Sequence, residues 1–582
     1  MTTSWRNWMV MAALAMLLAC MPQGPTGRLL AAPAPGTAAC PEGNAGLTLP
    51  RGFCATVFAD GLGHARHLAV APNGVLYVNT WSGEYFPNSP LHPGGFLVAL
   101  KSTASPDRAD QIERFGATPP TGAGGTGIAV WKGRLYAEID DRIERYDLPA
   151  QGITPKDEPV TVVSGLPLGG DHPMHPFIID AKGNLFVDVA SASNACQARN
   201  RQREVPGTDP CRELETRGGI WRFEANATNQ KFSAASRYAT GIRNAEGLAQ
   251  DAQGHLYVTQ HGRDQLHSSW PRLYQPEEEA TLPAEQVMQL QPGADYGWPY
   301  CYFDPTRGHL VLAPEYGGDG GKAVGRCAGK VAPLAVFPAH WGPDDMVYYG
   351  QEQFPARYRG GLFIAFHGSW NRAPYPQAGY NLVYQSVGAG ATSPRCEIFA
   401  DGFAGADRSP EGASHRPAGL AIAPDGALFV SDDARGRIYR ITYRGGGDGS
   451  LADADVPCPA ASMPVTAHPA MTVDPRTLSV PQGATRETVE RGARLYRGEE
   501  GGAGCVGCHG ATGGGSPLGP NLTDRQWLWS DGSVAGIRRT IEQGVAAPRQ
   551  YRSPMPALGG GTLDDAQLSA LSAFVWGLSH PR

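Results

Sequence analysis

The chain of 582 residues lacks two features that would indicate nucleic acid as a partner or insertion into a membrane. It has no basic run, and its formal net charge is −6, which argues against nucleic acid as a partner. Its N-terminal apolar stretch, Trp8–Ala19, is too short to span a bilayer. Glycine and proline are abundant instead, at 76 and 50 residues, which favours many short strands and turns over helices.

The apolar stretch follows Arg6 and predicts an export signal over residues 1–32, and hence a periplasmic or otherwise exported protein. It ends in Leu17-Leu18-Ala19-Cys20, which resembles a bacterial lipoprotein processing site. In that case Cys20 carries a lipid, and this lipid is the expected contact with a membrane. The alternative is ordinary signal-peptidase cleavage near Ala31-Ala32, which removes Cys20.

The motif Cys505-Val506-Gly507-Cys508-His509 has the C-x-x-C-H pattern of a c-type haem attachment site. The two thiols would form thioethers with the haem, and His509 would be the proximal iron ligand. The methionine that follows it, Met555, predicts the sixth ligand, with His580 as the competing imidazole. The alternatives are a chance motif, or a zinc or redox pair of cysteines.

Two helices are predicted around this motif, one over 485–497 and one near the C-terminus. Leu568, Leu571, Val575 and Leu578 have helical spacing, and Thr562 with Asp565 predicts the start of that helix. Helix, haem motif, methionine loop and helix form the layout of a small all-α class I cytochrome c, which residues 485–582 resemble.

Cysteine counting supports export. The chain has 11 cysteines, and removing Cys20, Cys505 and Cys508 leaves an even number. Neighbouring couples suggest four disulfides in an oxidising compartment, although the sequence alone leaves the connectivity open. The couples are Cys40/Cys54, Cys196/Cys211, Cys301/Cys327 and Cys396/Cys458.

Residues 40–445 contain a recurring pattern of an alternating apolar strand, a turn at glycine and a second strand. Five clear copies lie at 67–78, 127–136, 176–187, 247–258 and 419–430, and a weaker one ends at Ile364. Repeated hairpins at this spacing predict a mainly β fold, a six-bladed β-propeller. The alternative is a β-sandwich. Residues 446–484 lack periodicity and are interpreted as a linker.

Loops that flank the repeats carry polar motifs: Arg243-Asn244-x-x-Gly247-Leu248, Asp295-Tyr296-Gly297-Trp298-Pro299 and His367-Gly368-Ser369-Trp370-Asn371-Arg372. With these, residues 47–443 resemble sugar dehydrogenases that use pyrroloquinoline quinone (PQQ) on a six-bladed propeller, including soluble glucose, aldose, L-sorbosone and fungal pyranose dehydrogenases. The resemblance implies PQQ and Ca²⁺ as cofactors, besides haem c.

The resemblance also implies residue roles. His172 matches the general base, Asp171 a substrate-side carboxylate and Arg243 a group that stabilises charge on the quinone oxygen. The remaining matches are PQQ contacts at Arg243, Asn244, Trp370, Arg372 and Arg416, and backbone carbonyls for Ca²⁺ at Gly262 and Arg263. Alternatives remain open: a turn histidine for His172, ion pairs for Arg243 and Arg416, and packing for Trp298 and Trp370. His261, His340 and His367 are interpreted as structural.

The prediction is therefore a quinohaemoprotein that oxidises an aldose or sugar aldehyde at C1 and passes electrons through its own haem. The expected acceptor is another cytochrome, a copper protein or a membrane oxidase. Glu246, where glucose enzymes carry glutamine, leaves the sugar open. One alternative is oxidation of a non-sugar alcohol or aldehyde. The other is a non-enzymatic propeller that binds carbohydrate or a partner, with the cytochrome as an electron relay.

Overall fold

The computed structural model describes most of the chain that follows the predicted export signal. The predicted signal, including Cys20, and part of the predicted linker lie outside the described residues. The described ranges are 40–81, 93–117, 125–372, 375–387, 395–408, 412–445, 456–464, 473–501, 504–515, 519–546, 548–551 and 555–582. None of the helices in these ranges is long and apolar enough to cross a membrane.

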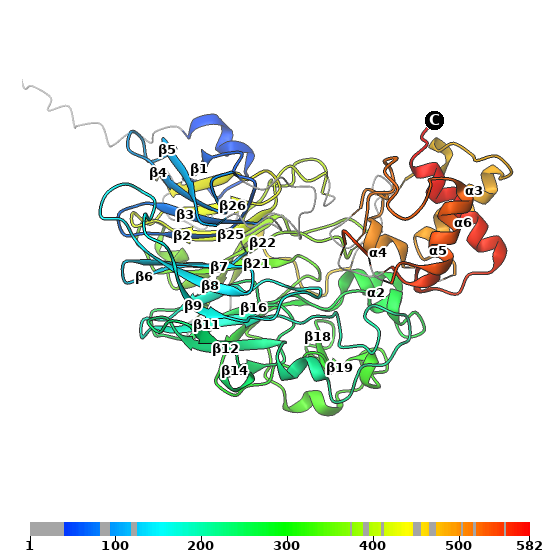
Figure 1. The fold of residues 1–582 in the computed structure, drawn as a ribbon, viewed down its shortest axis with the longest axis horizontal. Helices are drawn as coiled ribbons and strands as arrows, with labels where there is room; N and C mark the ends of the chain where they lie inside the picture. Colours follow the sequence, from blue (N-terminus) through cyan, green and yellow to red (C-terminus); the bar gives the residue numbers. More distant parts are fainter. Residues whose placement is uncertain are drawn as a thin grey trace, which may run out of the picture. The chain divides into compact units, whose positions relative to one another are not determined.

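Residues 53–443 form a β-propeller, and six blades of four antiparallel strands can be traced in the described ranges (Figure 1). The first blade contains β2 (His64–Val70), β3 (Leu76–Trp81), β4 (Leu97–Lys101) and β5 (Gln111–Phe115). The second contains β6 (Ile128–Trp131), β7 (Arg134–Ile139), β8 (Arg142–Asp147) and β9 (Val160–Ser164). The third contains β10 (Phe177–Ile179), β11 (Asn184–Val189), β12 (Gly219–Glu224) and β14 (Arg237–Thr240).

The fourth blade contains β15 (Leu248–Gln250), β16 (Leu256–Gln260), β17 (Glu285–Leu290) and β20 (Ala335–Phe337). The fifth contains β21 (Pro343–Tyr349), β22 (Gly361–Phe366), β23 (Asn381–Ser386) and β24 (Cys396–Ala400). The sixth contains β25 (Pro417–Ile422), β26 (Leu428–Asp432), β27 (Ile438–Tyr443) and β1 (Phe53–Ala59). Each predicted repeat is the first hairpin of a blade or, in the weaker copy, its second strand, so the propeller prediction is confirmed.

The ring is closed by the two ends of the propeller sequence. β1 pairs antiparallel with β27, from Phe53 opposite Tyr443 to Ala59 opposite Ile438, although nearly the whole propeller separates them in sequence. The first strand of every blade also contacts the first strands of both neighbouring blades. Pairing around a complete circle protects the strand edges that an open sheet would expose.

Apolar side chains fill the space between adjacent blades. Between the fifth and sixth blades, Phe53 packs edge-on against Phe354 and Phe399, with ring centroids 4.8 and 4.9 Å apart. All three rings are buried, as are most of the alternating apolar residues of the predicted strands. This packing holds the loops at the blade ends in fixed positions.

Short elements are added to the blades. β13 (Gln230–Lys231) pairs parallel with β9, and β28 (Val456–Pro457) extends the fifth blade beside β24. The fourth blade carries an insertion that contains α1 (Leu266–Ser269), α2 (Pro276–Thr281) and the hairpin of β18 (Cys301–Asp304) with β19 (His309–Leu312). β28 lies in the predicted linker, so residues 456–457 of that segment belong to the propeller sheet.

Four disulfides are present among the described residues, and all four couple the neighbouring cysteines that the sequence suggested: Cys40–Cys54, Cys196–Cys211, Cys301–Cys327 and Cys396–Cys458. Cys396–Cys458 fastens the start of the predicted linker to the fifth blade. Cys505 and Cys508 are not disulfide-bonded.

The C-terminal part is helical, with α3 (Arg486–Tyr496), α4 (Cys505–His509), α5 (Val534–Gln543) and α6 (Asp565–Leu578), shown in orange and red in Figure 1. Thr485 caps α3 as a capping box with Thr488. The prediction that Thr562 starts α6 is wrong: Asp564 accepts from the Gln567 amide, so the box lies two residues later. The apolar positions predicted for α6 are buried.

α3 and α6 cross at a glycine. A Cβ placed on Gly492 would lie 2.1 Å from the Ala570 carbonyl oxygen and 2.6 Å from the Phe574 Cβ. Backbone atoms cannot yield as a flexible side chain can, so only glycine allows the two helices to approach this closely.

Gly492→Val is expected to destabilise the C-terminal part by roughly 3 kcal/mol, at the upper end of overpacking costs. Thermal unfolding followed by haem absorption measures the change. Arg494→Val is the matched control, because Arg494 is an exposed residue of the same helix and tests the helix propensity of valine alone. Equal losses in the two variants would contradict the account of the helix crossing.

Candidate functional site

The loops at one end of the blades surround a cavity of about 530 Å³, which we call the propeller cavity. This volume lies within the range of about 300–1,000 Å³ usual for small-molecule sites. The predicted site residues that line it are Asp171, His172, Arg243, Asn244, Gly262, Trp370 and Arg416. They come from loops next to the third to sixth blades, so the ring brings together residues that are far apart in sequence.

His172 lies in the loop before β10 and contacts the loop after β11. Its Nδ1 lies 2.9 Å from the Ser191 carbonyl oxygen. A carbonyl can only accept, so Nδ1 carries the proton and Nε2 keeps the lone pair of a base. Burial lowers the pKa of His172 well below its usual value, and the nearby positive charge of Arg243 lowers it further. The imidazole is therefore neutral at pH 7.

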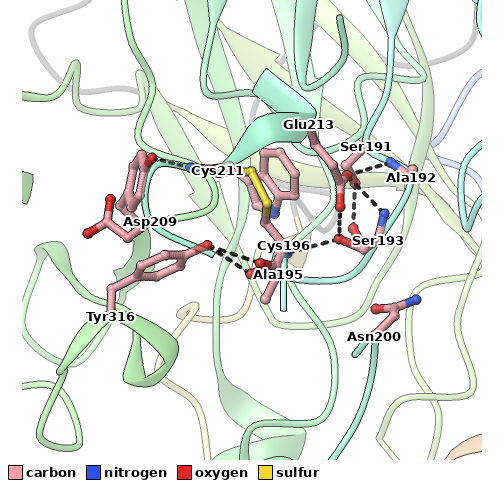
Figure 2. Close-up of a disulfide and its surroundings, with 12 residues drawn as sticks. Ser191, Ala192, Ser193, Ala195, Cys196, Asn200, Asp209, Cys211, Glu213 and Tyr316 are labelled. Atoms are coloured by element: carbon pink, nitrogen blue, oxygen red, sulfur yellow. Dashed lines mark hydrogen bonds between the residues drawn. A yellow bond between two sulfur atoms is a disulfide. The ribbon is translucent and has the colours of Figure 1, made fainter. Parts of the chain in front are cut away.

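The Ser191 loop is itself fixed by hydrogen bonds and a disulfide (Figure 2). The Ser191 hydroxyl donates to the Ser193 carbonyl over 2.7 Å, and the Ser193 hydroxyl donates to Glu213. Glu213 also accepts from the Ala192 amide at 2.8 Å. Cys196–Cys211 lies directly beside these groups. The orientation of His172 thus depends on a loop built by the third blade.

Asp171 and Arg243 belong to one ion-pair network with Asp264 and Arg201. Arg201 contacts Asp171 at 2.9 Å and Asp264 at 2.8 Å, and Arg243 contacts Asp264 at 2.9 Å. All four side chains are less than one-tenth exposed. Two carboxylates balance two guanidinium groups, which makes their burial tolerable. Burial would raise the pKa of Asp264, but the two arginines outweigh it and hold that pKa below its usual value.

Arg243 has a further role in the cavity wall. Its Nη1 donates to the Gly262 carbonyl oxygen at 3.0 Å, and its Nη2 donates to the Asn194 side chain at 3.1 Å. Burial lowers the pKa of Arg243 from its usual value. Arginine nevertheless stays charged in proteins. The guanidinium is therefore held in a fixed position at the edge of the cavity, where Asp264 balances its charge.

Arg416, on the loop before β25, donates through Nε to the His367 carbonyl at 3.2 Å and through Nη2 to the Gly368 carbonyl at 2.9 Å. The oxygens of these carbonyls are neutral, so they hold the side chain without neutralising it. Arg416 therefore presents an arginine charge to the cavity, as a carboxylate ligand would require.

The structure does not place Arg372 or Arg263 in the cavity lining. The Arg372 guanidinium donates to the Pro376 and Ala339 carbonyls at 2.9 and 3.0 Å, which fixes the loop after β22. The Arg263 side chain pairs with buried Glu315 at 2.5 Å. Only the backbone carbonyl of Arg263 was predicted to bind Ca²⁺, so this pairing is compatible with that role.

Several buried acids and histidines line the cavity as well. Burial raises the pKa of Glu246 to about 8 and that of Glu285 to about 7. Burial also lowers the pKa of His261 and His340 to about 4. At pH 7 the two histidines are neutral and Glu246 is largely protonated, so the net charge of the wall is smaller than its residue types suggest.

Sequence reasoning missed Arg201 and assigned His261, His340 and His367 to structure alone. All four line the cavity. His367 donates to Asp433 at 2.8 Å, and Asp433 also pairs with Arg66 at 2.8 Å. Arg201 stands in a loop without periodicity, and its one local cue was the flanking pair Cys196 and Cys211. For the three histidines a signal was present, because they lie next to blade strands in the sequence, as the residues predicted for the site do.

The C-terminal part and loops of the propeller together line a second pocket, the haem pocket, which contains Cys505, Cys508, His509 and Met555 and has a mostly apolar surface. The Nδ1 of His509 donates to the Pro520 carbonyl at 2.9 Å, which leaves Nε2 to bind a metal. Met555 is held in an isolated bridge with Val545 by two hydrogen bonds, of 2.8 and 3.0 Å. The predicted haem ligands thus share one apolar pocket.

Together, the propeller with a polar cavity and the helices with a haem motif define an oxidoreductase that transfers electrons. The family model described as TrAA12-like matches residues 47–444, more than half of the chain, and the chain belongs to this family. A second model, described as cytochrome c oxidase, cbb3-type, subunit III, matches residues 487–575. The predicted combination of a PQQ sugar dehydrogenase-like propeller with a cytochrome c domain is confirmed.

Relatives match separate parts of the chain. A pyrroloquinoline quinone-dependent pyranose dehydrogenase of Coprinopsis cinerea is 29% identical over 238 residues, which are 35% of this chain and 31% of that protein. The cbb3-type cytochrome c oxidase subunit FixP of Rhizobium etli is 38% identical over 79 residues, 13% of this chain and 27% of that protein. The chain therefore matches less than a third of the length of each of these two relatives.

A solved structure, the holo form of the pyranose dehydrogenase PQQ domain from Coprinopsis cinerea, covers 68% of this chain and 97% of its own. It superposes with a TM-score of 0.53 at 20% identity. The calcium structure of the Trichoderma reesei family AA12 enzyme has the same TM-score at 19% identity and covers 70% and 99%. These likenesses establish the shared propeller fold.

The propeller cavity offers a positively charged group for a carboxylate and unpaired acceptors for a donor group of a ligand. Arg416 supplies a guanidinium group that suits a carboxylate. The buried side-chain oxygens of Asn244 and Asn371 have no hydrogen-bond partner among the described residues and can accept from an N–H or O–H group of a ligand. Such unpaired polar atoms are unfavourable unless a ligand or water bonds to them. In the described ranges, no group of three or more His, Cys, Asp or Glu side chains is placed to hold a metal ion.

Proposed function

We propose that the protein is an exported quinohaemoprotein that oxidises an aldose or sugar aldehyde at C1. The observation that carries the proposal is one cavity with a neutral histidine, fixed arginines and unpaired amide oxygens, in the same chain as a haem pocket. The similar pyranose dehydrogenase of Coprinopsis cinerea is named for its dependence on PQQ. Bound PQQ would supply the two-electron acceptor that no side chain provides.

The chain's own residues would do the acid–base and electrostatic work. Nε2 of His172 would take the hydroxyl proton of the sugar, since that nitrogen holds the lone pair. Asp171, fixed by Arg201, would bind a second sugar hydroxyl. Arg243 would stabilise negative charge that develops on the acceptor oxygen. These steps require only that the sugar C1 lies within reach of His172.

Arg416, Arg243, Asn244 and Trp370 would hold the quinone. Arginines suit carboxylates because the guanidinium group offers paired donors. Ca²⁺ would bind the backbone carbonyls of Gly262 and Arg263, and the cofactor would supply further oxygen ligands. The Gly262 carbonyl now accepts from Arg243, so Ca²⁺ would share or replace that contact.

The expected export rests on the four disulfides, which suit an oxidising compartment. The haem would then pass electrons to a cytochrome, a copper protein or a membrane oxidase outside the cytoplasm. Lipid on Cys20 would keep the protein at a membrane.

Binding of PQQ tests the proposal without any substrate. Titration of the haem-loaded protein with PQQ, in the presence of Ca²⁺, is expected to quench tryptophan fluorescence, because Trp370 lines the cavity. Arg416→Gln should weaken binding by roughly tenfold to a hundredfold, as expected for loss of a charged hydrogen bond. Arg134→Gln is the control, since its guanidinium lies on the outer part of β7 and pairs with exposed Asp147. Absence of PQQ binding would contradict the proposed dehydrogenase function.

A further inference from the structure

Arg201 lies on a loop that a disulfide closes. The loop connects β11 with β12, and Cys196–Cys211 joins its two sides with a Cα separation of 6.1 Å (Figure 2). The Gln197 side chain donates to the carbonyls of Gln202 and Val205 at 2.9 and 3.0 Å. The Glu204 amide also bonds the Ser269 carbonyl at 2.8 Å. The loop therefore has a defined shape, which holds the Arg201 side chain in place.

The guanidinium of Arg201 joins three blades. Nε and Nη2 bind Asp171 and Asp264, and Nη1 donates to the Gln265 side chain at 3.1 Å. Its carbon lies 5.9 Å from the ring centroid of Trp370, within the range of a cation–π contact. Its side chain is 6% exposed. Through these contacts Arg201 is part of the wall of the propeller cavity.

Arg201 is also part of the wall of the haem pocket. Arg203, Gln265, Ser268 and Ser269 line that pocket beside it. Two contacts support this arrangement: Arg203 Nη1 donates to the Gly501 carbonyl at 3.4 Å, and a Cβ placed on Gly504 would lie 3.5 Å from the Ser268 Cβ. Gly504 directly precedes the haem-binding Cys505. One arginine therefore faces both cavities.

We propose that Arg201 couples the two redox sites and that electrons cross from the propeller cavity to the haem past this residue, because Arg201 lines both cavities. The proposal rests on the proposed function. Oxidation of a sugar C1–OH to the lactone releases two electrons and two protons. His172 takes the hydroxyl proton, and the two electrons leave C1 together with its hydrogen for the bound PQQ. The haem iron takes these electrons from the cofactor one at a time, Fe(III) to Fe(II), while the second proton passes to solvent. An external one-electron acceptor must reoxidise the haem before the second electron arrives.

The charge of Arg201 gives the proposal a readout that needs neither PQQ nor sugar. With Arg201 present, Asp171 and Asp264 are balanced by Arg201 and Arg243. Without it, one unbalanced negative charge remains on Asp171 and Asp264, next to the position of Arg201 in the wall of the haem pocket. Negative charge stabilises Fe(III) over Fe(II), so the haem reduction potential should fall.

The experiment compares three full-length, haem-loaded variants: Arg201→Met, Arg201→Lys and Arg203→Met. A redox titration of the PQQ-free proteins measures the haem potential. A second measurement, after PQQ loading, takes the ratio of the haem reduction rate to the reduction rate of a small soluble dye that reaches the cavity itself. Arg203 lines the haem pocket but is not among the residues that line the propeller cavity, which makes Arg203→Met the matched control for the rate ratio.

Arg201→Met is expected to lower the haem potential and to reduce the rate ratio at least tenfold. Arg201→Lys should keep the potential, because it keeps the charge, and Arg203→Met should leave the ratio unchanged. An unaltered potential and ratio in Arg201→Met would overturn the proposal. If Arg201→Met fails to fold, Arg201→Lys provides the test, because lysine breaks the paired contacts to Asp171 and Asp264. An unaltered rate ratio in Arg201→Lys would then overturn the proposal. If no sugar is oxidised, the proposed function fails while the potential still tests the position of Arg201.

Discussion

His172→Ala is expected to lower sugar-driven haem reduction by a factor of about 10²–10⁴, the range usual for loss of a general base. The haem spectrum and PQQ binding should persist, since His172 belongs to neither the haem pocket nor the proposed carboxylate contacts. Stopped-flow absorption of the haem after mixing with sugar measures the rate. His255→Ala is the matched control, because that imidazole is 53% exposed and pairs only with its local Asp251. Unchanged turnover in His172→Ala would remove His172 from the mechanism.

The same residue sets the pH dependence. A base works in its unprotonated form, so the rate is lost as the pH falls through the pKa of His172. Burial and the charge of Arg243 hold that pKa well below 6.5. The rate of sugar oxidation should therefore stay level from pH 8 down past 6.5 and decline only at lower pH. A decline centred near the ordinary histidine value would show that this imidazole is not the base.

Met555→Ala is expected to change the haem absorption spectrum and to lower the reduction potential by roughly 100 mV or more, part of the ~0.8 V range over which axial ligands tune haem. The thioether favours Fe(II), so its loss favours Fe(III). The measurements are a spectrum of the oxidised protein and a redox titration.

The matched control for this change is Met463→Ala, because Met463 is 47% exposed and lies outside the haem pocket. PQQ binding should be the same in both variants. A Met555→Ala spectrum identical to that of the unaltered protein would exclude Met555 as the ligand.

Local pattern predicted most of the architecture. Alternating strands around glycine turns, such as residues 67–78, correspond to the paired strands β2 and β3, because the period of two and the turn act within a dozen residues. The cysteine couples were also local, with separations of 14, 15, 26 and 62 residues. Likewise, helical spacing identified the buried face of α6. The cap of α6 was wrong because Thr562 and Asp564 both suit that position, and only the backbone decides between them.

The site was harder to predict because its contacts join distant segments. Asp171 and Asp264 meet through Arg201, and no periodicity or spacing in the sequence links these three positions. The close approach of α3 and α6 at Gly492 is equally invisible without the partner helix. The resemblance to PQQ-dependent sugar dehydrogenases predicted several residues that line the propeller cavity. They could not identify a residue such as Arg201, whose contacts connect the propeller cavity to a haem pocket at the other end of the sequence.

The most direct test of the central claim is haem reduction in the full-length protein, loaded with haem and mixed with a panel of aldoses, with and without PQQ and Ca²⁺. We predict that at least one aldose reduces the haem when PQQ and Ca²⁺ are present, and that none does so when PQQ is omitted. Reduction by non-sugar alcohols alone would contradict the assigned substrate. Failure of every substrate to reduce the haem of a PQQ-loaded protein would contradict the claim that the propeller supplies electrons to its own haem.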